Sequence, residues 1–397
     1  MKPQRTFKAL RPARWAVSFG IALLAGCGGG GVSVTDTTGA PDGNGWAWAL
    51  PANFPTPKVP VDNPMSAAKV ELGRFLFYDK RLSGNGTQSC GSCHEQARAF
   101  TLPTETARGS TGEFTPRNAQ GLANVAYNAT LTWANPSLVT LERQMETPLF
   151  GEGPVEMGIN DGNKAAVLAR IAVDASYPAR FAAAFANEPT PVVNWNTIIK
   201  AISAFQRTMI SGDSRYDRYL AGTATLAADE TRGMNLFFGE KAECFHCHGS
   251  FNFNDQIVHA TSRVVETPFH NTGLYNIDGQ GGFPYPNRGV FELSAKAEDM
   301  GMFRAPSLRN VAVTPPYMHD GGKATLEAVL DHYAAGGSLI TSGPNAGDGR
   351  ANPYKSDLVA RIDLSAQDKT DLIAFLKTLT DETLLTHPKF SDPFAAQ

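Results

Sequence analysis

The chain has 397 residues, of which 42% are hydrophobic, and its formal net charge is −3. This length allows two domains of ordinary size, and the hydrophobic content supports packed cores. The near-neutral charge provides no electrostatic basis for nucleic-acid binding, so that class of protein is excluded.

Residues 1–26 have the pattern of a bacterial export signal. Residues 2–14 carry five basic side chains, and the apolar run that follows, residues 15–25, is too short to span a bilayer. The run ends in Leu24-Ala25-Gly26-Cys27, which is typical of a lipoprotein signal. We expect cleavage before Cys27 and lipidation of its thiol, which would anchor a periplasmic protein to a membrane. The alternative is an ordinary secretory cleavage site that contains a cysteine.

Beyond this signal, residues 27–59 are rich in Gly, Pro, Thr and Asn and predict a flexible tether. From Asn63 to Tyr78 the apolar residues take helical spacing, so an ordered domain begins near residue 60. Further helical patterns lie over residues 137–146, 163–173, 178–186 and 194–211.

Two short motifs carry the clearest chemistry. Cys90-Gly91-Ser92-Cys93-His94 predicts a covalent c-type haem attachment site, in which both thiols would form thioethers and His94 would become an iron ligand. The motif returns as Cys244-Phe245-His246-Cys247-His248. A four-cysteine zinc site is the alternative, but zinc sites do not require a histidine directly after each pair. Two haems use four of the five cysteines, which leaves Cys27 and no pair for a disulfide.

The second half of the chain repeats the organisation of the first. After a break at Gly222-Thr223, residues 226–238 form a helical pattern that runs into the second motif. Residues 249–305 predict a long loop, and helical patterns over 326–335 and 365–379 close the chain. No stretch is rich in strand patterns. The expected fold is all-α, with one haem in an N-terminal cytochrome c domain over 60–222 and one in a C-terminal cytochrome c domain over 223–397.

The segments around the motifs resemble the di-haem cytochrome c peroxidase/MauG superfamily over about residues 55–380. The matching segments are Asn63-Pro64-Met65, Glu71-Leu72-Gly73-Arg74, Leu82-Ser83, Arg117-Asn118-Ala119, Pro154-Val155-Glu156-Met157-Gly158, Leu308-Arg309-Asn310 and Pro316-Tyr317-Met318-His319-Asp320-Gly321. Residues 270–276 and 298–301 further resemble a MauG-like (MbnH-like) subgroup, whose members are encoded beside a periplasmic copper-binding protein.

The resemblance implies that the sixth ligand of the second haem lies 14 residues after His319, which is Tyr333. Peroxidases of the group have methionine there, whereas MauG has tyrosine. An anionic oxygen ligand stabilises ferric and higher iron states, whereas a thioether favours ferrous iron. The alternative role of Tyr333 is that of a core aromatic residue on its helix. The other candidate ligands are Met300, Met318, His319 and His332.

The resemblance makes the first haem, with His94 as its proximal ligand, the one that reacts with peroxide. No histidine lies between His94 and His246, so the distal histidine of many peroxidases of the group is absent. Glu156 and Gln144 match the superfamily's distal glutamate and glutamine, and Pro148 falls between them. A carboxylate beside an apolar haem face can have a raised pKa and move a proton during O–O cleavage. The alternative for Glu156 and Gln144 is an ordinary solvated position.

Two further features follow from the resemblance. Trp133 matches the tryptophan between the two haems, where an indole can relay an electron, although a large core residue is a compatible reading. Asn118, Thr314 and Pro316 match the positions that hold a calcium ion between the domains, and hard oxygen ligands suit calcium.

The resemblance therefore implies a peroxide-dependent di-haem oxidase. It would react with H2O2 at the first haem and oxidise an aromatic (Trp) side chain of a periplasmic copper-binding partner protein through high-valent haem iron. The alternatives are a cytochrome c peroxidase, which takes electrons from a small cytochrome or cupredoxin, and a pure electron-transfer cytochrome. Tyr333 and the missing distal histidine favour the oxidase over the peroxidase, and Glu156 with Gln144 disfavours electron transfer alone.

Overall fold

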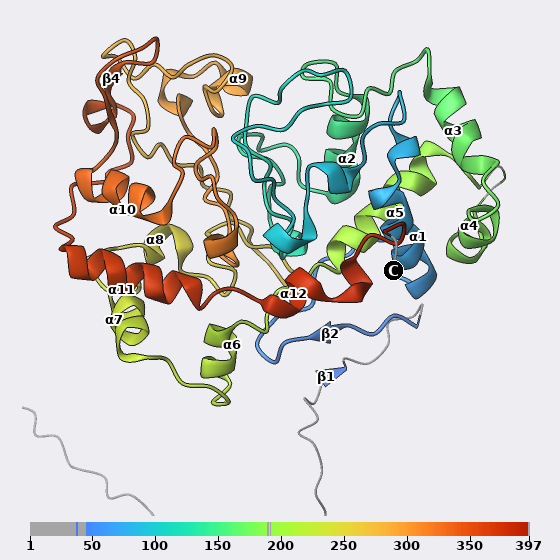
Figure 1. The fold of residues 1–397 in the computed structure, drawn as a ribbon, viewed down its shortest axis with the longest axis horizontal. Helices are drawn as coiled ribbons and strands as arrows, with labels where there is room; N and C mark the ends of the chain where they lie inside the picture. The colour runs from blue at the N-terminus through green and yellow to red at the C-terminus, as the bar shows by residue number, and fades with distance from the viewer. Residues whose placement is uncertain (1–36, 39–44, 189, 191, 396–397) are drawn as a thin grey trace, which may run out of the picture. The chain divides into compact units, whose positions relative to one another are not determined.

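A computed structural model of the protein describes residues 37–38, 45–188, 190 and 192–395. Their regular secondary structure is mostly helical with few strands, as predicted (Figure 1). Two antiparallel pairs contain all the named strands of the described residues: β1 (Thr37–Thr38) with β2 (Ala49–Leu50), and β3 (Leu339–Ile340) with β4 (Gly347–Asp348). The predicted signal peptide and Cys27 lie outside the described residues. None of the described helices is long and apolar enough to cross a membrane.

The first helix group surrounds the crossing of α1 and α5. Ser66 begins α1 because its hydroxyl accepts a hydrogen bond from the backbone NH of Lys69. At Gly73 the two helices are so close that a Cβ there would lie 2.0 Å from the carbonyl oxygen of Ala201. The helices of this group are α1 (Ala67–Tyr78), α2 (Leu141–Phe150), α3 (Lys164–Ala172), α4 (Pro178–Ala184) and α5 (Trp195–Arg207).

The second helix group repeats this crossing with α7 and α11. A Cβ at Gly233 of α7 would lie 1.9 Å from the carbonyl oxygen of Asp371. In both groups a phenylalanine four residues after the contact, Phe205 or Phe375, also lies at the crossing. A Cβ added at the glycine would be 2.9 Å from the Cβ of this phenylalanine. The remaining α-helices of the described chain are α6 (Arg215–Leu220), α7 (Ala228–Phe237), α8 (Phe245–His248), α9 (Phe291–Ser294), α10 (Leu326–Ala335), α11 (Ala366–Lys377) and α12 (Glu382–Thr386).

Most predicted helices are found within a few residues of their predicted bounds, but one is displaced. The helix predicted over 137–146 begins only at Leu141, because Thr140 caps it by accepting from the backbone NH of Arg143. It continues to Phe150 with Pro148 inside it. Single-turn 3-10 helices lie at Lys80–Leu82, Cys90–Ser92, Gln96–Arg98, Val125–Tyr127, Ala297–Asp299, Val311–Val313, Gly349–Ala351 and Pro388–Phe390.

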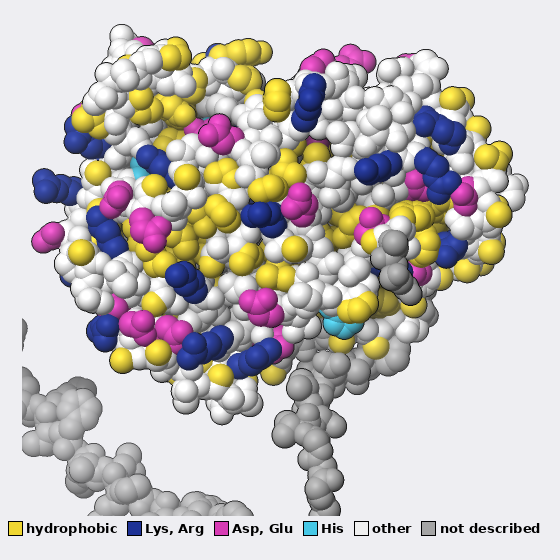
Figure 2. Space-filling model, in the orientation of Figure 1, with side chains coloured by type: hydrophobic (Ala, Val, Ile, Leu, Met, Phe, Trp, Pro, Cys, Tyr) yellow, Lys and Arg dark blue, Asp and Glu magenta, His cyan; other side chains and the backbone are white. Residues whose placement is uncertain are grey.

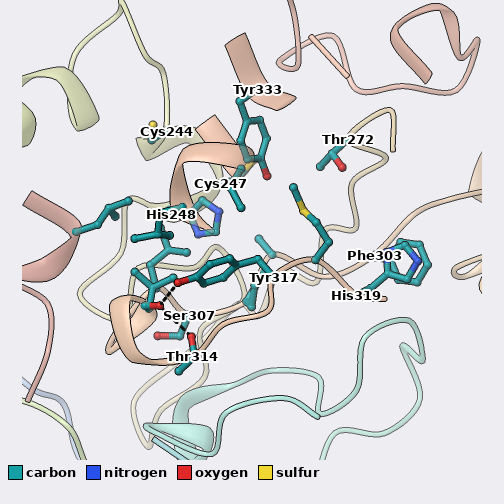
Figure 3. A pocket seen from close by; sticks show the side chains of 18 of the residues that line it. Cys244, Cys247, His248, Thr272, Phe303, Ser307, Thr314, Tyr317, His319 and Tyr333 are labelled. Carbon is teal, nitrogen blue, oxygen red and sulfur yellow. Dashed lines mark hydrogen bonds between the residues drawn. The ribbon is translucent and has the colours of Figure 1, made fainter. Parts of the chain in front are cut away.

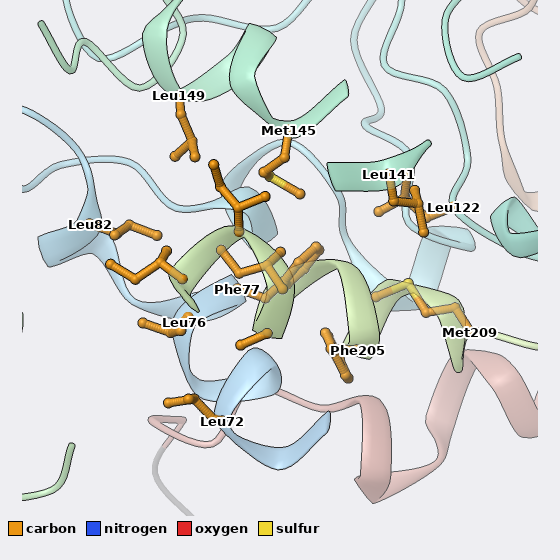
Figure 4. Close-up of a cluster of buried hydrophobic side chains, with 14 of the residues drawn as sticks. Leu72, Leu76, Phe77, Leu82, Leu122, Leu141, Met145, Leu149, Phe205 and Met209 are labelled. Atoms are coloured by element: carbon orange, nitrogen blue, oxygen red, sulfur yellow. The ribbon is translucent and has the colours of Figure 1, made fainter. Parts of the chain in front are cut away.

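Each helix group has its own hydrophobic core. Leu72 and Phe77 of α1, Met145 of α2 and Phe205 of α5 meet in the first core (Figure 4). The second core is built around the α7–α11 crossing. The chain then leaves α11 and returns to the first group, where residues 384–390 of the C-terminal segment join the first core. The division at residue 222 into two cytochrome c domains stays a prediction.

Residues 51–56, which the composition assigned to a tether, pack against segments far along the chain. The ring of Phe54 lies 6.0 Å from that of Tyr127 and 4.8 Å from that of Phe251. The hydroxyl of Tyr127 also donates to the carbonyl oxygen of Pro55 at 2.7 Å. The sequence did not predict these contacts, because the partners of Phe54 lie far along the chain.

The α7–α11 crossing gives a prediction about stability. We expect Gly233→Ala to lower the free energy of unfolding by about 1–3 kcal/mol, because a methyl group there forces two packed helices apart. Thermal and denaturant unfolding of the purified protein measure this change. Asn235→Ala, at an exposed position of the same helix, is the matched control and should change stability by less than about 0.5 kcal/mol. Equal stability of the two variants would contradict the close contact at Gly233.

Candidate functional site

The histidines of the two Cys-x-x-Cys-His motifs are held in the same way. Nδ1 of His94 donates to the carbonyl oxygen of Phe100 at 2.7 Å, and Nδ1 of His248 donates to that of Phe253 at 2.8 Å. Both phenylalanines have left-handed backbones, with φ of 64° and 53°, which turn their carbonyl groups toward the histidines. Because a carbonyl only accepts, Nδ1 carries the proton in each ring and Nε2 is the atom available to a metal.

The second pocket is the cavity lined by Cys244, Cys247 and His248 together with many leucine and valine side chains. Its volume is about 260 Å³. Tyr333 comes from α10 and its side chain projects into the same space as His248 (Figure 3). Burial raises the pKa of the Tyr333 phenol above its usual range.

On one face of the molecule, hydrophobic side chains gather over α8 with charged side chains around them (Figure 2).

Two of the other four candidate ligands lie outside the second pocket. Met300 and His332 do not line the second pocket, whereas Met318 and His319 do. The ring of His319 stacks on that of Phe303 with centroids 3.7 Å apart, to one side of His248 and Tyr333 (Figure 3). Nδ1 of His332 hydrogen-bonds with the Ser338 hydroxyl at 2.8 Å, and burial lowers the pKa of this imidazole to about 4. The assignment of Tyr333 as ligand stays a prediction.

The first pocket is the cavity lined by Cys90, Cys93 and His94, with a volume of about 810 Å³. Gln144 and Pro148 line it from α2, where they are four residues apart and therefore lie on one face of the helix. Glu156 lines it from the loop after α2. The pocket therefore brings together the three residues that the sequence placed around the first haem, although their roles stay predictions.

The loop around Glu156 is fixed by its backbone. The carbonyl oxygen of Glu156 accepts from the NH of Ser110 at 2.7 Å, and the NH of Met157 donates to the carbonyl oxygen of Pro148 at 3.0 Å. The side chain is half-buried, and burial raises the pKa of its carboxyl group. A carboxyl group with a raised pKa is suited to taking up and releasing a proton near neutral pH.

Trp133 lines both pockets and so lies between the two motifs. Its indole NH donates to the carbonyl oxygen of Asn118 at 2.8 Å, and its own carbonyl oxygen accepts from the NH of Arg304 at 2.8 Å. The first bond holds the indole ring of Trp133, and the second holds its backbone. Its role as an electron relay stays a prediction.

The residues of both pockets fit a covalent c-type haem. Each pocket has two cysteines and a histidine whose Nε2 is free to bind iron, and the four cysteines are free thiols. The predicted zinc alternative requires all four thiols at one site, whereas they line two different pockets.

Comparison with known proteins agrees with this chemistry. Residues 67–225 match the family model of the di-haem cytochrome c peroxidases. The chain is 34% identical to the cytochrome-c peroxidase IdrP1 of Pseudomonas sp. (strain SCT), over 85% of this chain and 88% of that protein. It is 31% identical to the methylamine utilization protein MauG of Methylorubrum extorquens, over 89% and 92%. The chain belongs to the di-haem cytochrome c peroxidase/MauG family. Membership implies two c-type haems and makes the protein a di-haem oxidoreductase.

A solved structure gives a more specific likeness for this di-haem enzyme. A MauG-like protein associated with microbial copper homeostasis is 61% identical, with a TM-score of 0.86, and the match covers 88% of this chain and 99% of that one. This identity is much higher than the identities to the peroxidase and to MauG. The resemblance of the sequence to a MauG-like group is therefore confirmed.

The predicted calcium ligands of the di-haem enzyme, Asn118, Thr314 and Pro316, all line the second pocket. The side-chain nitrogen of Asn118 donates to the carbonyl oxygens of Thr104 and Glu105 at 3.0 and 3.2 Å. This orientation leaves the amide oxygen of Asn118 as the atom for a cation. Calcium binding stays a prediction.

The carbonyl groups that orient the two histidines were not predicted from the sequence. The signal was present, because a phenylalanine follows His94 by six residues and His248 by five. Only the left-handed turns of the folded chain show that these two phenylalanines accept the Nδ1 hydrogen bonds.

Proposed function

We propose that this di-haem enzyme uses hydrogen peroxide to oxidise a tryptophan side chain of a partner protein, and that the partner is a periplasmic copper-binding protein. The observation that carries the proposal is the tyrosine at position 333, whose side chain enters the second pocket beside His248. An oxygen ligand favours the oxidised states of iron that such a reaction needs. The link of the 61% identical protein to copper homeostasis supports the choice of partner.

The residues divide the work between the two pockets. Bound haems would supply the redox chemistry of peroxide reduction. In the first pocket, Glu156 takes a proton from one peroxide oxygen and delivers it to the other as the O–O bond breaks. Gln144 orients the peroxide by hydrogen bonding, and Pro148 limits the space around it. Trp133 provides an aromatic path between the pockets that it lines.

The same proposal assigns the ligands and the location. Cys90, Cys93 and His94 hold the haem of the first pocket. Cys244, Cys247, His248 and Tyr333 hold the haem of the second. Calcium binds at Asn118, Thr314 and Pro316, and a lipid on Cys27 anchors the protein to a membrane in the periplasm.

A cytochrome c peroxidase is the second candidate function, with a small cytochrome or cupredoxin as the electron donor. Two observations favour it. Met318 lines the same pocket as Tyr333, and a thioether ligand there would favour ferrous iron. A relative with 34% identity is named a cytochrome-c peroxidase.

We expect peroxide and the diferric enzyme, without any other donor, to convert a copper-binding partner into a product heavier by oxygen at a tryptophan. Mass spectrometry of the partner after digestion measures this change. The control omits peroxide and should leave the partner unmodified. The proposal would be wrong if the partner stayed unmodified while the enzyme, after reduction of its second haem, consumed peroxide rapidly with a reduced cytochrome.

A further inference from the structure

Arg304 is a buried cation in the wall of the second pocket. Only 3% of the residue is exposed, and it lines the second pocket. Its Nε donates to the carbonyl oxygen of Thr132 at 3.3 Å, and its Nη2 donates to the side-chain oxygen of Gln120 at 3.0 Å. Its backbone NH donates to the carbonyl oxygen of Trp133 at 2.8 Å. Arg304 is therefore tied to the segment that carries Trp133 at two points.

Arg304 takes part in none of the ion pairs found among the described residues. The nearby Asp255 favours its charge, but this carboxylate pairs with Nε2 of His270 at 2.5 Å and not with the guanidinium. The other fully buried arginines differ in this respect. Arg207 is paired with Glu142 at 2.6 Å and Arg309 with Asp217 at 2.8 Å.

Two buried donors at this place have no acceptor. They are Nη1 of Arg304 and the side-chain nitrogen of Gln120. Burial lowers the pKa of Arg304 to about 10, which still leaves the group charged at neutral pH. A buried charge without a counter-ion is strongly unfavourable. The two unused donors belong to side chains that hydrogen-bond to each other, and a carboxylate has two oxygens that could accept from both.

We infer that Nη1 of Arg304 and the side-chain nitrogen of Gln120 bind a propionate carboxylate of the haem in the second pocket. The inference rests on the two haems that the proposed function requires, and it adds a positioning role. Because Arg304 also holds the backbone of Trp133, the bound carboxylate fixes the haem relative to the residue that lies between the pockets. Gln120 lines both pockets, so the first haem is the other possible source of the carboxylate.

The test is a spectroscopic redox titration of Arg304→Met as the two-haem protein, with the low-spin and high-spin haems followed separately. Loss of a positive charge beside a haem favours the ferric form. We expect the ferric-to-ferrous ratio of the low-spin haem to rise roughly tenfold at a fixed potential, a fall in midpoint potential of about 59 mV. Because an unpaired propionate binds a proton more readily, this potential should also become pH-dependent near neutral pH. Arg304→Lys, which keeps the charge, should restore most of the potential.

Arg207→Met is the matched control, since it removes a buried arginine that is paired with Glu142 and does not line either pocket. An unchanged low-spin potential in Arg304→Met, an equal shift in Arg207→Met, or a shift confined to the high-spin haem would overturn the inference.

If Arg304→Met does not assemble with two haems, the midpoint potential of the low-spin haem is measured in Gln120→Leu by the same titration. This substitution should lower the potential by a smaller amount, and no change would overturn the inference. The titration uses neither peroxide nor a partner, so its result is independent of the proposed function.

Discussion

Glu156→Gln is expected to slow the reaction of the diferric enzyme with peroxide by roughly 10²–10⁴-fold, the usual contribution of a positioned proton carrier. Glutamine keeps the size and polarity of the side chain but cannot accept a proton. Since the chain has no histidine between His94 and His246, no imidazole from that segment can replace the carboxylate in the first pocket. Stopped-flow absorbance of the haems after mixing with peroxide measures the rate.

The pH dependence distinguishes proton transfer by Glu156 from a steric role. Burial raises the pKa of Glu156, so the proton-accepting carboxylate form is lost at a higher pH than in an exposed glutamate. The rate of the wild-type enzyme should therefore fall as the pH is lowered through this raised pKa, and Glu156→Gln should lack that fall. Glu152→Gln is the matched control, because Glu152 is exposed on the same loop and does not line the pocket. If Glu156→Gln reacted with peroxide as fast as Glu152→Gln, the Glu156 carboxylate would not be the proton carrier.

The features that could be predicted from the sequence are those with local signals. The two haem motifs consist of adjacent residues, and the helices around Phe77 and Phe375 follow from apolar spacing and capping residues. Thr140 shows the limit of such signals. Its cap shifts a helix by four residues from the predicted start at residue 137, because apolar residues before it also fit the helical period.

The features that could not be predicted depend on contacts between distant segments. Gly73 and Gly233 are ordinary helical glycines in the sequence, and only the folded chain shows that each allows another helix to pass. The return of residues 384–390 to the first core is likewise invisible locally, since their apolar pattern fits either core. Arg304 is one arginine among many until its burial and its unused donor are known. The structural role of such residues depends on their neighbours in the folded chain, and these neighbours come from distant parts of the sequence.

Tyr333→Phe is expected to convert most of the low-spin haem signal of the ferric enzyme to high-spin, because the phenylalanine ring fills the same space without an oxygen to bind iron. The electron paramagnetic resonance spectrum of the ferric protein measures this change. The same variant should shorten the lifetime of the oxidised form that peroxide produces, since the ligand that stabilises oxidised iron is gone.

Tyr317→Phe is the matched control for this prediction. Tyr317 lines the same pocket as Tyr333, and its hydroxyl donates to the carbonyl oxygen of Val311 at 3.0 Å (Figure 3). The same atom is removed from the same cavity, but the lost contact is a hydrogen bond to the backbone and not a bond to iron. The control should therefore keep both haem signals and lose only a little stability, about 1 kcal/mol. An unchanged low-spin signal in Tyr333→Phe would show that another residue binds the second haem. Met318 would then be the next residue to test by substitution, because it lines this pocket and its thioether would favour the peroxidase reaction.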